Sequence, residues 1–240
     1  MSVLELRHAS RIHGDGRTRV EALVDVSFAV AAGELVAVMG PSGSGKSTLL
    51  GLAGGLDRPS DGAVLVDGTD LGGQSPATLA RLRRRQVGYV FQQLNLIDGL
   101  TAVENVALPL ELDGGNRHEC RRRALAGLEE VEMAELADRF PEELSGGEQQ
   151  RVAIARAMVG DRILVLADEP TGALDSMTGE SVLRLLRARC HQGVSAVLVT
   201  HDARLAAWAD RILFLRDGRL VDESGPAGGP ESLLPDMAST

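Results

Sequence analysis

The sequence has few aromatic residues, few cysteines and no long apolar run. Aromatic residues make up only 2% of the 240 residues, too few for a surface that stacks nucleic-acid bases. The two cysteines, Cys120 and Cys190, have no metal-ligand spacing, so we interpret them as structural or incidental. No apolar stretch approaches the roughly 20 residues that a membrane-spanning helix needs, and the N-terminus does not resemble a signal peptide. We therefore expect a protein that is soluble or that reaches a membrane only through a partner.

An excess of basic residues is also missing. The 25 Lys and Arg residues are outnumbered by 34 Asp and Glu residues, and the net charge of −9 disfavours broad binding to nucleic acid or anionic lipid. The basic run Arg121-Arg122-Arg123 lies in an amphipathic segment at 117–139. We interpret this run as the solvated face of a helix, offset by Glu129, Glu130 and Glu132, rather than as an anion site.

What the sequence does contain is an alternation of short apolar runs and helical patterns. Hydrophobic residues make up 44% and charged residues 25%, an ordinary globular balance, and the length suits one sizeable domain. The expected strands are 3–7, 24–30, 35–39, 63–68, 163–167, 196–199 and 212–215; the expected helices are 47–56 and 179–189, with a mainly helical region at about 95–160. This order predicts an α/β fold with a mainly parallel sheet flanked by helices.

The glycine-rich stretch between residues 40 and 47 fits the phosphate-loop pattern G-x-x-x-x-G-K-S in full. A buried strand is expected before it and a helix after it, which is the context that this pattern requires. Glycines let backbone amides wrap around phosphate oxygens, and the helix N-terminus adds positive charge. We expect Lys46 to reach the β- and γ-phosphates and Ser47 to ligate Mg²⁺. The predicted nucleotide contacts in this stretch are Gly40, Pro41, Ser42, Gly43, Ser44, Gly45, Lys46, Ser47 and Thr48.

Polar residues follow three further apolar runs. Asp168 and Glu169 come after residues 163–167, and carboxylates at the carboxyl ends of parallel strands lie where ligands bind in open α/β sheets. We predict that Asp168 holds Mg²⁺ and that Glu169 deprotonates the attacking water. His201 ends another predicted strand; alone it is typical of capping or packing, but beside a phosphate loop it indicates a γ-phosphate contact. Gln92 follows the run at 88–90 and is a candidate for sensing the metal and the attacking water.

A second turn suited to phosphate lies far downstream, at Ser145-Gly146-Gly147-Glu148. Ser-x-x-Glu is a capping box, which predicts the start of a helix. Glycines are poor helix formers, so capping alone does not explain the pair, and a capped helix start with glycines is itself a small anion site. Two turns suited to phosphate, of which only one carries a lysine, suggest a nucleotide shared between two subunits.

Together these segments resemble the nucleotide-binding domain of ATP-binding cassette (ABC) proteins, over about 3–221. Residues 40–47 resemble Walker A, Gln92 the Q-loop, 144–148 the ABC signature, 163–168 Walker B with Glu169 as the catalytic glutamate, Ala173-Leu174-Asp175 the D-loop, and His201 the switch histidine. The resemblance implies a P-loop NTPase (RecA-like) core with a mainly parallel sheet, an N-terminal antiparallel β subdomain and an inserted α-helical subdomain at about 95–160. These parts would form one ATPase domain at 1–225, followed by a flexible tail at 226–240, next to a stretch rich in glycine and proline.

Two positions depart from the family pattern. His13 stands where most members have an aromatic residue that stacks on adenine, so we predict that its imidazole makes this contact with less area. The signature has Glu148 where glutamine is common. We assign Glu148 to the capping box, which leaves Ser145, Gly146 and Gly147 as the phosphate-facing residues.

The resemblance implies a mechanical function. Two copies would sandwich two ATP molecules, each with Mg²⁺, between the Walker A loop of one copy and the signature of the other, and hydrolysis would reopen this homodimer. An integral-membrane permease would dock on the segment after Gln92 and on the helical subdomain, which would place the chain at the cytoplasmic face of the cell membrane. Residues 88–92, 94–96, 101–110 and 167–176 are similar to the ATPases of macrolide-export and lipoprotein-release systems.

Two alternatives stay open at this point. A permease-like partner could control cell-wall enzymes without moving cargo, and the ATPase sequence does not separate this function from transport. A non-transport ABC ATPase acting on DNA or ribosomes is disfavoured, because the chain has one domain, no long heptad run and an acidic net charge.

Overall fold

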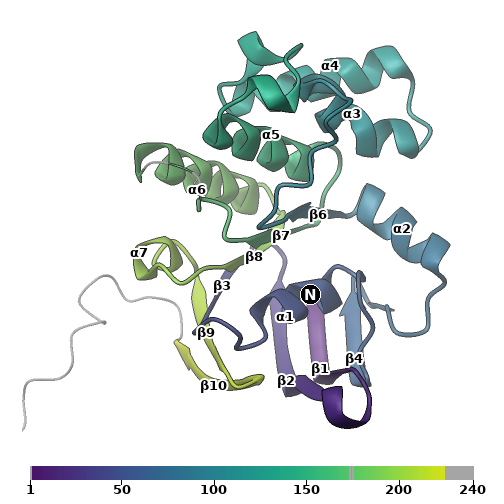
Figure 1. The fold of residues 1–240 in the computed structure, drawn as a ribbon, viewed down its shortest axis with the longest axis vertical. Helices are drawn as coiled ribbons and strands as arrows, with labels where there is room; N and C mark the ends of the chain where they lie inside the picture. Colours follow the sequence, from purple (N-terminus) through teal and green to yellow (C-terminus); the bar gives the residue numbers. More distant parts are fainter. Residues whose placement is uncertain (1, 173, 175, 225–240) are drawn as a thin grey trace, which may run out of the picture.

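The computed structural model describes residues 2–224 except 173 and 175, and it contains two β-sheets (Figure 1). The first sheet is antiparallel, in the order β2-β1-β4-β5. Its strands are β1 (Ser2–His13), β2 (Val20–Ala31), β4 (Asp61–Val66) and β5 (Thr69–Asp70). This sheet is the N-terminal antiparallel part that the sequence predicted.

The second sheet has the order β10-β9-β3-β8-β7-β6 and is parallel except for β10, which pairs antiparallel with β9. Its strands are β3 (Leu35–Met39), β6 (Val87–Val90), β7 (Leu164–Asp168), β8 (Ser195–Val199), β9 (Arg211–Arg216) and β10 (Arg219–Ser224). The central strand β3 is a continuous apolar run, and β7 and β8 are apolar apart from Asp168 and Ser195 at their ends, as expected for strands with both faces buried.

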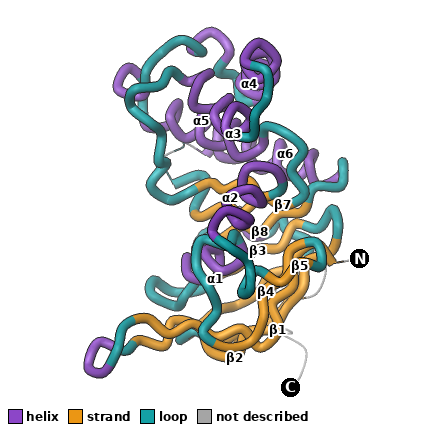
Figure 2. Tube along the Cα trace, turned by 90° about the vertical axis from the view of Figure 1, so that its right-hand side faces the viewer, coloured by secondary structure: helices purple, strands orange, loops and turns teal. Residues whose placement is uncertain are grey.

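The helices lie around this second sheet and above it (Figures 1 and 2). They are α1 (Lys46–Ala53), α2 (Pro76–Arg85), α3 (Ala102–Leu112), α4 (Arg117–Glu130), α5 (Gly146–Met158), α6 (Ser176–His191) and α7 (Ala203–Ala206), with 3₁₀ turns at Gly16–Thr18, Ala134–Leu136 and Pro141–Glu143. Helices α3, α4 and α5 gather at the top of Figure 1, away from the antiparallel sheet, and we call them the helical lobe.

Side-chain alternation along β3 divides the apolar interior into two cores. Val36 and Val38 belong to the lower core, which also contains Leu49 and Leu50 of α1 and the inner face of the antiparallel sheet. Leu35 and Ala37 point the other way, into an upper core. Helix α1 is therefore clamped between two sheets, which fixes the loop that precedes it.

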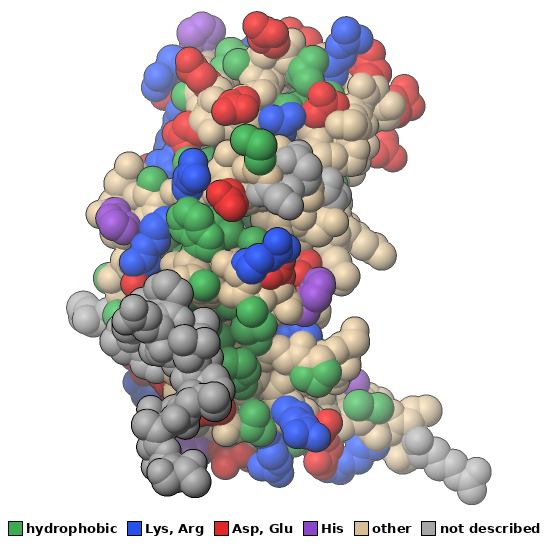
Figure 3. Space-filling view, turned by 90° about the vertical axis from the view of Figure 1, so that its left-hand side faces the viewer, with side chains coloured by type: hydrophobic (Ala, Val, Ile, Leu, Met, Phe, Trp, Pro, Cys, Tyr) green, Lys and Arg blue, Asp and Glu red, His purple; other side chains and the backbone are tan. Residues whose placement is uncertain are grey.

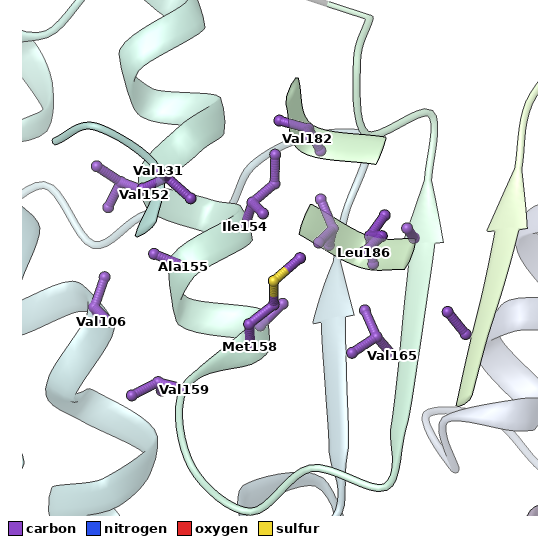
Figure 4. Close-up of a cluster of buried hydrophobic side chains, with 14 of the residues drawn as sticks. Val106, Val131, Val152, Ile154, Ala155, Met158, Val159, Val165, Val182 and Leu186 are labelled. Atoms are coloured by element: carbon purple, nitrogen blue, oxygen red, sulfur yellow. The ribbon is translucent and has the colours of Figure 1, made fainter. Parts of the chain in front are cut away.

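The upper core joins the parallel sheet to the helical lobe (Figure 4). Val165 of β7 lies on one side of this core, and Ile154 and Met158 of α5 lie in its centre. Val106 of α3 and Leu186 of α6 belong to the same cluster. Because α5 packs on β6 of the sheet as well as on α3 and α4, it is the main structural connection between the sheet and the rest of the lobe.

The predicted fold class is confirmed: a mainly parallel core sheet, an antiparallel N-terminal sheet and an inserted group of helices. Several boundaries differ from the sequence prediction. Strand β1 continues to His13 through a bulge at His8, where φ is +50° and the ring nitrogen Nδ1 lies 2.7 Å from Asp25 Oδ1. Helix α1 ends at Ala53, before Gly54 and Gly55. Helices α2 and α7 and strands β5, β6 and β10 were not predicted.

The segment predicted as amphipathic at 117–139 is helical only as far as Glu130, and a 3₁₀ turn follows. The basic run at 121–123 is solvated as predicted, but its partners are not Glu129, Glu130 and Glu132. Its three arginines pair with Asp138, Glu119 and Asp161. Glu130 instead holds Arg189 of α6 at 2.6 Å.

Charged side chains of both signs are interspersed over the face of the molecule in Figure 3. Between residues 2 and 224, leaving out 173 and 175, no helix is both long and apolar enough to cross a membrane. The predicted tail at 226–240 lies outside the described residues.

Candidate functional site

The phosphate loop joins β3 to α1 and has no room for side chains at two of its glycines. Gly45 is the N-cap of α1 with φ +103°, and a Cβ there would lie 2.3 Å from the carbonyl oxygen of Ala22. A Cβ at Gly40 would lie 2.0 Å from the carbonyl oxygen of Leu215. Since Gly45 has no side chain to cap the helix, the first amides of α1 are available to an anion.

Lys46 bends back over this loop. Its Nζ donates hydrogen bonds to the carbonyl oxygens of Gly40 at 2.8 Å and Pro41 at 2.9 Å. The Ser44 hydroxyl, in the middle of the loop, is buried and has no hydrogen-bond partner in the part of the chain that is described. The ammonium group is thus fixed at the mouth of the loop, where it is ready to pair with phosphate oxygens.

A cavity of about 290 Å³ opens above the loop and collects most of the predicted site residues. It is lined by Val20, Glu21, Ala22, Ser42, Gly43, Gly45, Lys46, Ser47, Thr48, Gln92, Asp168 and Glu169. The phosphate loop, the Q-loop glutamine and the two carboxylates, which are distant in sequence, therefore share one site.

The two carboxylates occupy different environments. Asp168 is the last residue of β7 and is buried. Burial raises its pKa above the ordinary value, and neighbouring Glu169 acts in the same direction, whereas a hydrogen bond from the Ser47 side chain and the charge of Lys46 oppose both. A cation at this position would favour the ionised form of Asp168.

Glu169 follows in the left-handed region, with φ +47°, and its side chain turns toward the end of β8. Its Oε1 lies 2.7 Å from His201 Nδ1 and accepts the His201 backbone N–H at 3.1 Å. Its Oε2 accepts the Thr200 hydroxyl at 3.3 Å. These contacts fix the orientation of the Glu169 carboxylate.

His201 gives this pair a pH-dependent character. The hydrogen bond to Glu169, with its negative charge, raises the pKa of His201 above the ordinary value of 6.5. The His201 side chain is 80% exposed, whereas that of Glu169 is only 16% exposed. The imidazole is thus the accessible member of the pair, and it is not among the residues that line the cavity.

The structure also brings in residues that the sequence had not singled out. Thr200 is completely buried and orients both Glu169 and the Asp202 backbone N–H. The signal available was its place as a polar residue directly after the apolar run at 196–199. Val20, Glu21 and Ala22 line the cavity because β2 begins at Val20, four residues before the strand predicted from the sequence.

His13 is placed beside the cavity, not in its lining. It ends β1 and is the cross-strand partner of Val20, whose side chain does line the cavity. Val20 is 59% exposed, which is unusual for a valine and leaves an apolar surface open at the entrance. The adenine contact of His13 stays a prediction. Val20 provides an apolar surface next to His13.

The signature turn lies in the helical lobe. Ser145 is the N-cap of α5, and its Oγ and backbone N–H both donate to Glu148 Oε2, at 2.8 and 2.7 Å. The predicted capping box is therefore confirmed. The residues that line the cavity include none of 145–148, although all four are described. Gly146 and Gly147 are the first residues of α5. Helix α5 lies in the helical lobe, on the other side of the parallel sheet from α1 (Figure 1).

Two members of the predicted D-loop, Ala173 and Asp175, lie outside the described residues. In the part of the chain that is described, no group of three or more His, Cys, Asp or Glu side chains could hold a metal ion. Ser47, Gln92 and Asp168 offer one hydroxyl, one amide and one carboxylate to the cavity. This set fits Mg²⁺ that arrives with a nucleotide, because Mg²⁺ takes few protein ligands and keeps phosphate oxygens and water.

Comparisons with known proteins agree with this geometry. The profile of the ABC transporter family matches residues 23–172. A macrolide export ATP-binding/permease protein of Rhodospirillum rubrum is 45% identical over 234 residues, which are 96% of this chain and 36% of that protein. An uncharacterized ABC transporter ATP-binding protein of Thermotoga maritima is 47% identical over 218 residues, 91% of this chain and 93% of that protein. The chain thus spans about a third of the length of the macrolide-export relatives.

A solved structure gives the same result in three dimensions. The dimeric ATP-binding cassette MJ0796, bound to ADP and Pi, superposes with a TM-score of 0.90 and 42% identity, covering 94% of this chain and 99% of that one. A protein of the same name from Methanocaldococcus jannaschii is 43% identical to this chain over 226 residues. With a family match over more than half of its length and a complete structural counterpart, the chain belongs to the ABC transporter family.

Proposed function

We propose that this chain is the ATP-hydrolysing subunit of an ABC transporter. The observation that carries this proposal is the single cavity where Lys46, Ser47, Gln92, Asp168 and Glu169 meet above a glycine loop. Family membership and the likeness to a cassette bound to ADP and Pi support hydrolysis as the reaction.

Each residue has a distinct task in this reaction. The loop amides and Lys46 would bind the phosphates, and Ser47, Gln92 and Asp168 would hold Mg²⁺. When bound, Mg²⁺ would neutralise charge on the phosphate oxygens. Glu169 accepts a proton from water as the water oxygen attacks the γ-phosphorus and the bond to ADP breaks, a role that is worth about 10²- to 10⁴-fold in rate.

We also propose that the complete site needs a second copy of the chain. The signature turn is a capped helix start with two glycines, and it lies in the helical lobe instead of at the cavity of its own chain. A head-to-tail pair would bring Ser145, Gly146 and Gly147 of each copy to the phosphates held by the other. The dimeric form of MJ0796 supports this arrangement.

The partner that receives the motion is proposed to be an integral-membrane permease, which would hold the chain at the cytoplasmic face of the cell membrane. The macrolide-export relatives are named as ATP-binding and permease protein together, and the chain corresponds to about a third of their length. Their names support an exporter-like function over the regulation of cell-wall enzymes. The identity of the membrane protein that copurifies with the chain tests this choice.

Lys46 provides a test of nucleotide binding without any substitution, because it is the only lysine in the sequence. An amine-reactive reagent should modify Lys46 and stop phosphate release, and ATP should protect it. Peptide mass spectrometry separates Lys46 from the N-terminal amine, which serves as the internal control. Equal modification of Lys46 with and without saturating ATP would contradict the proposed site.

Substitutions test the assigned roles. Lys46→Ala should abolish ATP turnover, and Glu169→Gln should keep ATP binding but trap an ATP-bound dimer, measured by phosphate release and by light scattering. Ser145→Arg should prevent that dimer. If Glu169→Gln hydrolyses ATP at the wild-type rate with the permease present, Glu169 is not the base. For adenine stacking, His13→Ala should weaken ATP binding and His13→Tyr should not.

A further inference from the structure

The chain beyond Gln92 is fastened to the helical lobe by Arg156. This residue lies in the last turn of α5, and its two terminal guanidinium nitrogens donate to the carbonyl oxygens of Leu94 and Asn95, both at 2.6 Å. Asn95 has φ +50°, a left-handed conformation that asparagine tolerates better than most residues. The turn at Asn95 thus presents two successive carbonyls to one planar guanidinium.

A second residue fastens the next part of the same segment. Asn105 of α3 is fully buried, and its Oδ1 accepts the Ile97 backbone N–H at 2.8 Å. Its Nδ2 donates to the carbonyl oxygens of Ile97, Leu100 and Thr101. The segment from 94 to 101 is therefore part of the helical lobe, although it follows a strand of the core sheet.

On the other side of Gln92, the chain is fixed to the core. Phe91 stacks on Tyr89 of β6, with the ring centroids 4.1 Å apart and the planes inclined by 21°. Only Gln92 and Gln93 remain between this contact and the first carbonyl held by Arg156, and both are exposed. The position of Gln92 at the cavity thus depends on how the lobe is oriented relative to the core.

Helix α5 carries the signature turn at its other end. From Ser145 to Arg156 the helix rises about 16 Å. Its C-terminal end rests on the core, where a Cβ at Gly88 of β6 would lie 1.8 Å from the carbonyl oxygen of Ala157. One rigid helix therefore carries the signature turn at its N-terminal end and Arg156, which binds the chain beyond Gln92, at its C-terminal end.

Packing alone does not account for an arginine at this position. Burial lowers the pKa of Arg156, and no ion pair joins it to a carboxylate among the residues described. Arg156 is partly buried. A partly buried cation without an anionic partner is costly, and an apolar side chain of similar length would fill the same space. The two carbonyl contacts are what an apolar side chain cannot supply.

We infer that Arg156 is a positioning residue that couples Gln92 to the signature helix. The contact of Gln92 with the metal in one site and the contact of the signature turn with the nucleotide in the partner's site would therefore change together. This inference rests on the proposed ATPase function. Arg156 touches no substrate in this scheme; it acts through the backbone of Leu94 and Asn95. Its loss should impair the reaction while leaving the phosphate loop intact.

The first experiment separates positioning from folding. Arg156→Met should lower kcat about 10- to 100-fold, the loss expected when a catalytic group is misplaced by about 1 Å. The Kd for ADP measured without Mg²⁺ should stay within about twofold of wild type, because metal-free ADP makes no contact with Gln92 in this scheme and is held by the phosphate loop. Arg156→Lys keeps the charge without the planar fork and should show a smaller loss of kcat with the same affinity for metal-free ADP. Arg122→Met, at an exposed arginine of α4, is the matched control and should leave both values unchanged.

The second experiment is a double-mutant cycle with Gln92→Ala. If Arg156 acts through Gln92, Arg156→Met should reduce kcat by less than about threefold in the Gln92→Ala background. Effects that multiply, a parallel loss of affinity for metal-free ADP, or a fully active Arg156→Lys would each overturn the inference while leaving the ATPase function in place. A wild-type chain that hydrolyses no ATP would overturn the proposed function and this inference together.

Discussion

Replacing Glu148 by glutamine is expected to tighten the ATP-dependent dimer. The carboxylate accepts the backbone N–H and the hydroxyl of Ser145, and these hydrogen bonds lower its pKa below the ordinary range, so it is ionised at neutral pH. In the proposed dimer the Ser145 hydroxyl faces the partner's γ-phosphate. Glu148 thus competes for the only proton of that hydroxyl and adds a negative charge beside the phosphate.

The size of this effect follows from the geometry. Glu148 Oε2 lies 2.8 Å from Ser145 Oγ. A phosphate oxygen hydrogen-bonded to the same hydroxyl would be at most about 5.5 Å from the carboxylate. Two unit charges at that separation repel by about 0.8 kcal/mol in water and about 3 kcal/mol at an effective permittivity of 20. Because Glu148 is partly exposed, solvent screening places the value near the lower limit, about 1 kcal/mol per site.

A symmetric dimer contains two such sites, so the dimer dissociation constant should fall about 30-fold. The measurement is sedimentation of Glu169→Gln protein, which is expected to hold ATP, with and without Glu148→Gln. The gain should shrink as salt is raised, because exposed charges are screened. Capping should survive, since glutamine also fits the third position of a capping box.

Glu104→Gln is the matched control. Glu104 accepts the backbone N–H and the hydroxyl of Thr101 in an equivalent capping box at the start of α3, and these hydrogen bonds do not involve the signature turn. This control removes the same charge and should leave the dimer dissociation constant unchanged. A Glu148→Gln dimer within about twofold of its parent, or an equal shift in Glu104→Gln, would refute the repulsion between Glu148 and the partner's phosphate.

Three further predictions concern single groups. Glu169→Gln should lower the pKa of His201 in an NMR titration, and an unchanged pKa would exclude the pair in solution. Because the pKa of His201 in the folded state is raised above 6.5, the interaction with Glu169 stabilises the fold fully below pH 6.5. This stabilisation is lost as the pH rises through the folded-state pKa. Asn105→Ala should destabilise by about 2–4 kcal/mol and lower Tm by about 5–15 °C in calorimetry, because buried backbone groups lose their partner; a change below about 2 °C would contradict this. Cys190 is buried, which raises its pKa to about 11, and Cys120 is buried too. Neither thiol should therefore react with a disulfide reagent at pH 8 until urea unfolds the protein, and fast reaction of the native protein would disprove this.

Sequence reasoning was strongest where a chemical pattern and a structural pattern coincide. The phosphate loop could be predicted because its glycines, Lys46 and Ser47 lie between a buried strand and a helix. The capping box at Ser145 could be predicted because it is local, with both partners within one helical turn. Helix α2 was missed because charged residues dominate it: its C-terminal half is largely arginine, and only Leu79 and Leu82 are buried.

Long-range contacts could not be predicted from the sequence. The pairing of Glu169 with Thr200 and His201 depends on β7 lying beside β8, a pairing of distant segments. Strand β1 continues past its bulge at His8 as far as His13, which pairs with Val20 at the start of β2. This pairing extends β2 to Val20, which lines the cavity. Polar residues at the bulge interrupt the alternation that marks a strand, so the sequence pattern ends too early.

The sequence by itself determined the glycine loop at 40–47 and the capped turn at Ser145, because each needs particular side chains at short, local spacings. Only the tertiary structure decided how those groups are connected. Arg156 and Leu94 are 62 residues apart, yet one guanidinium links the signature helix to the chain beyond Gln92. That contact depends on α5 packing across the upper core, and helix packing is set by the complementary surfaces of many residues that are far apart in the sequence.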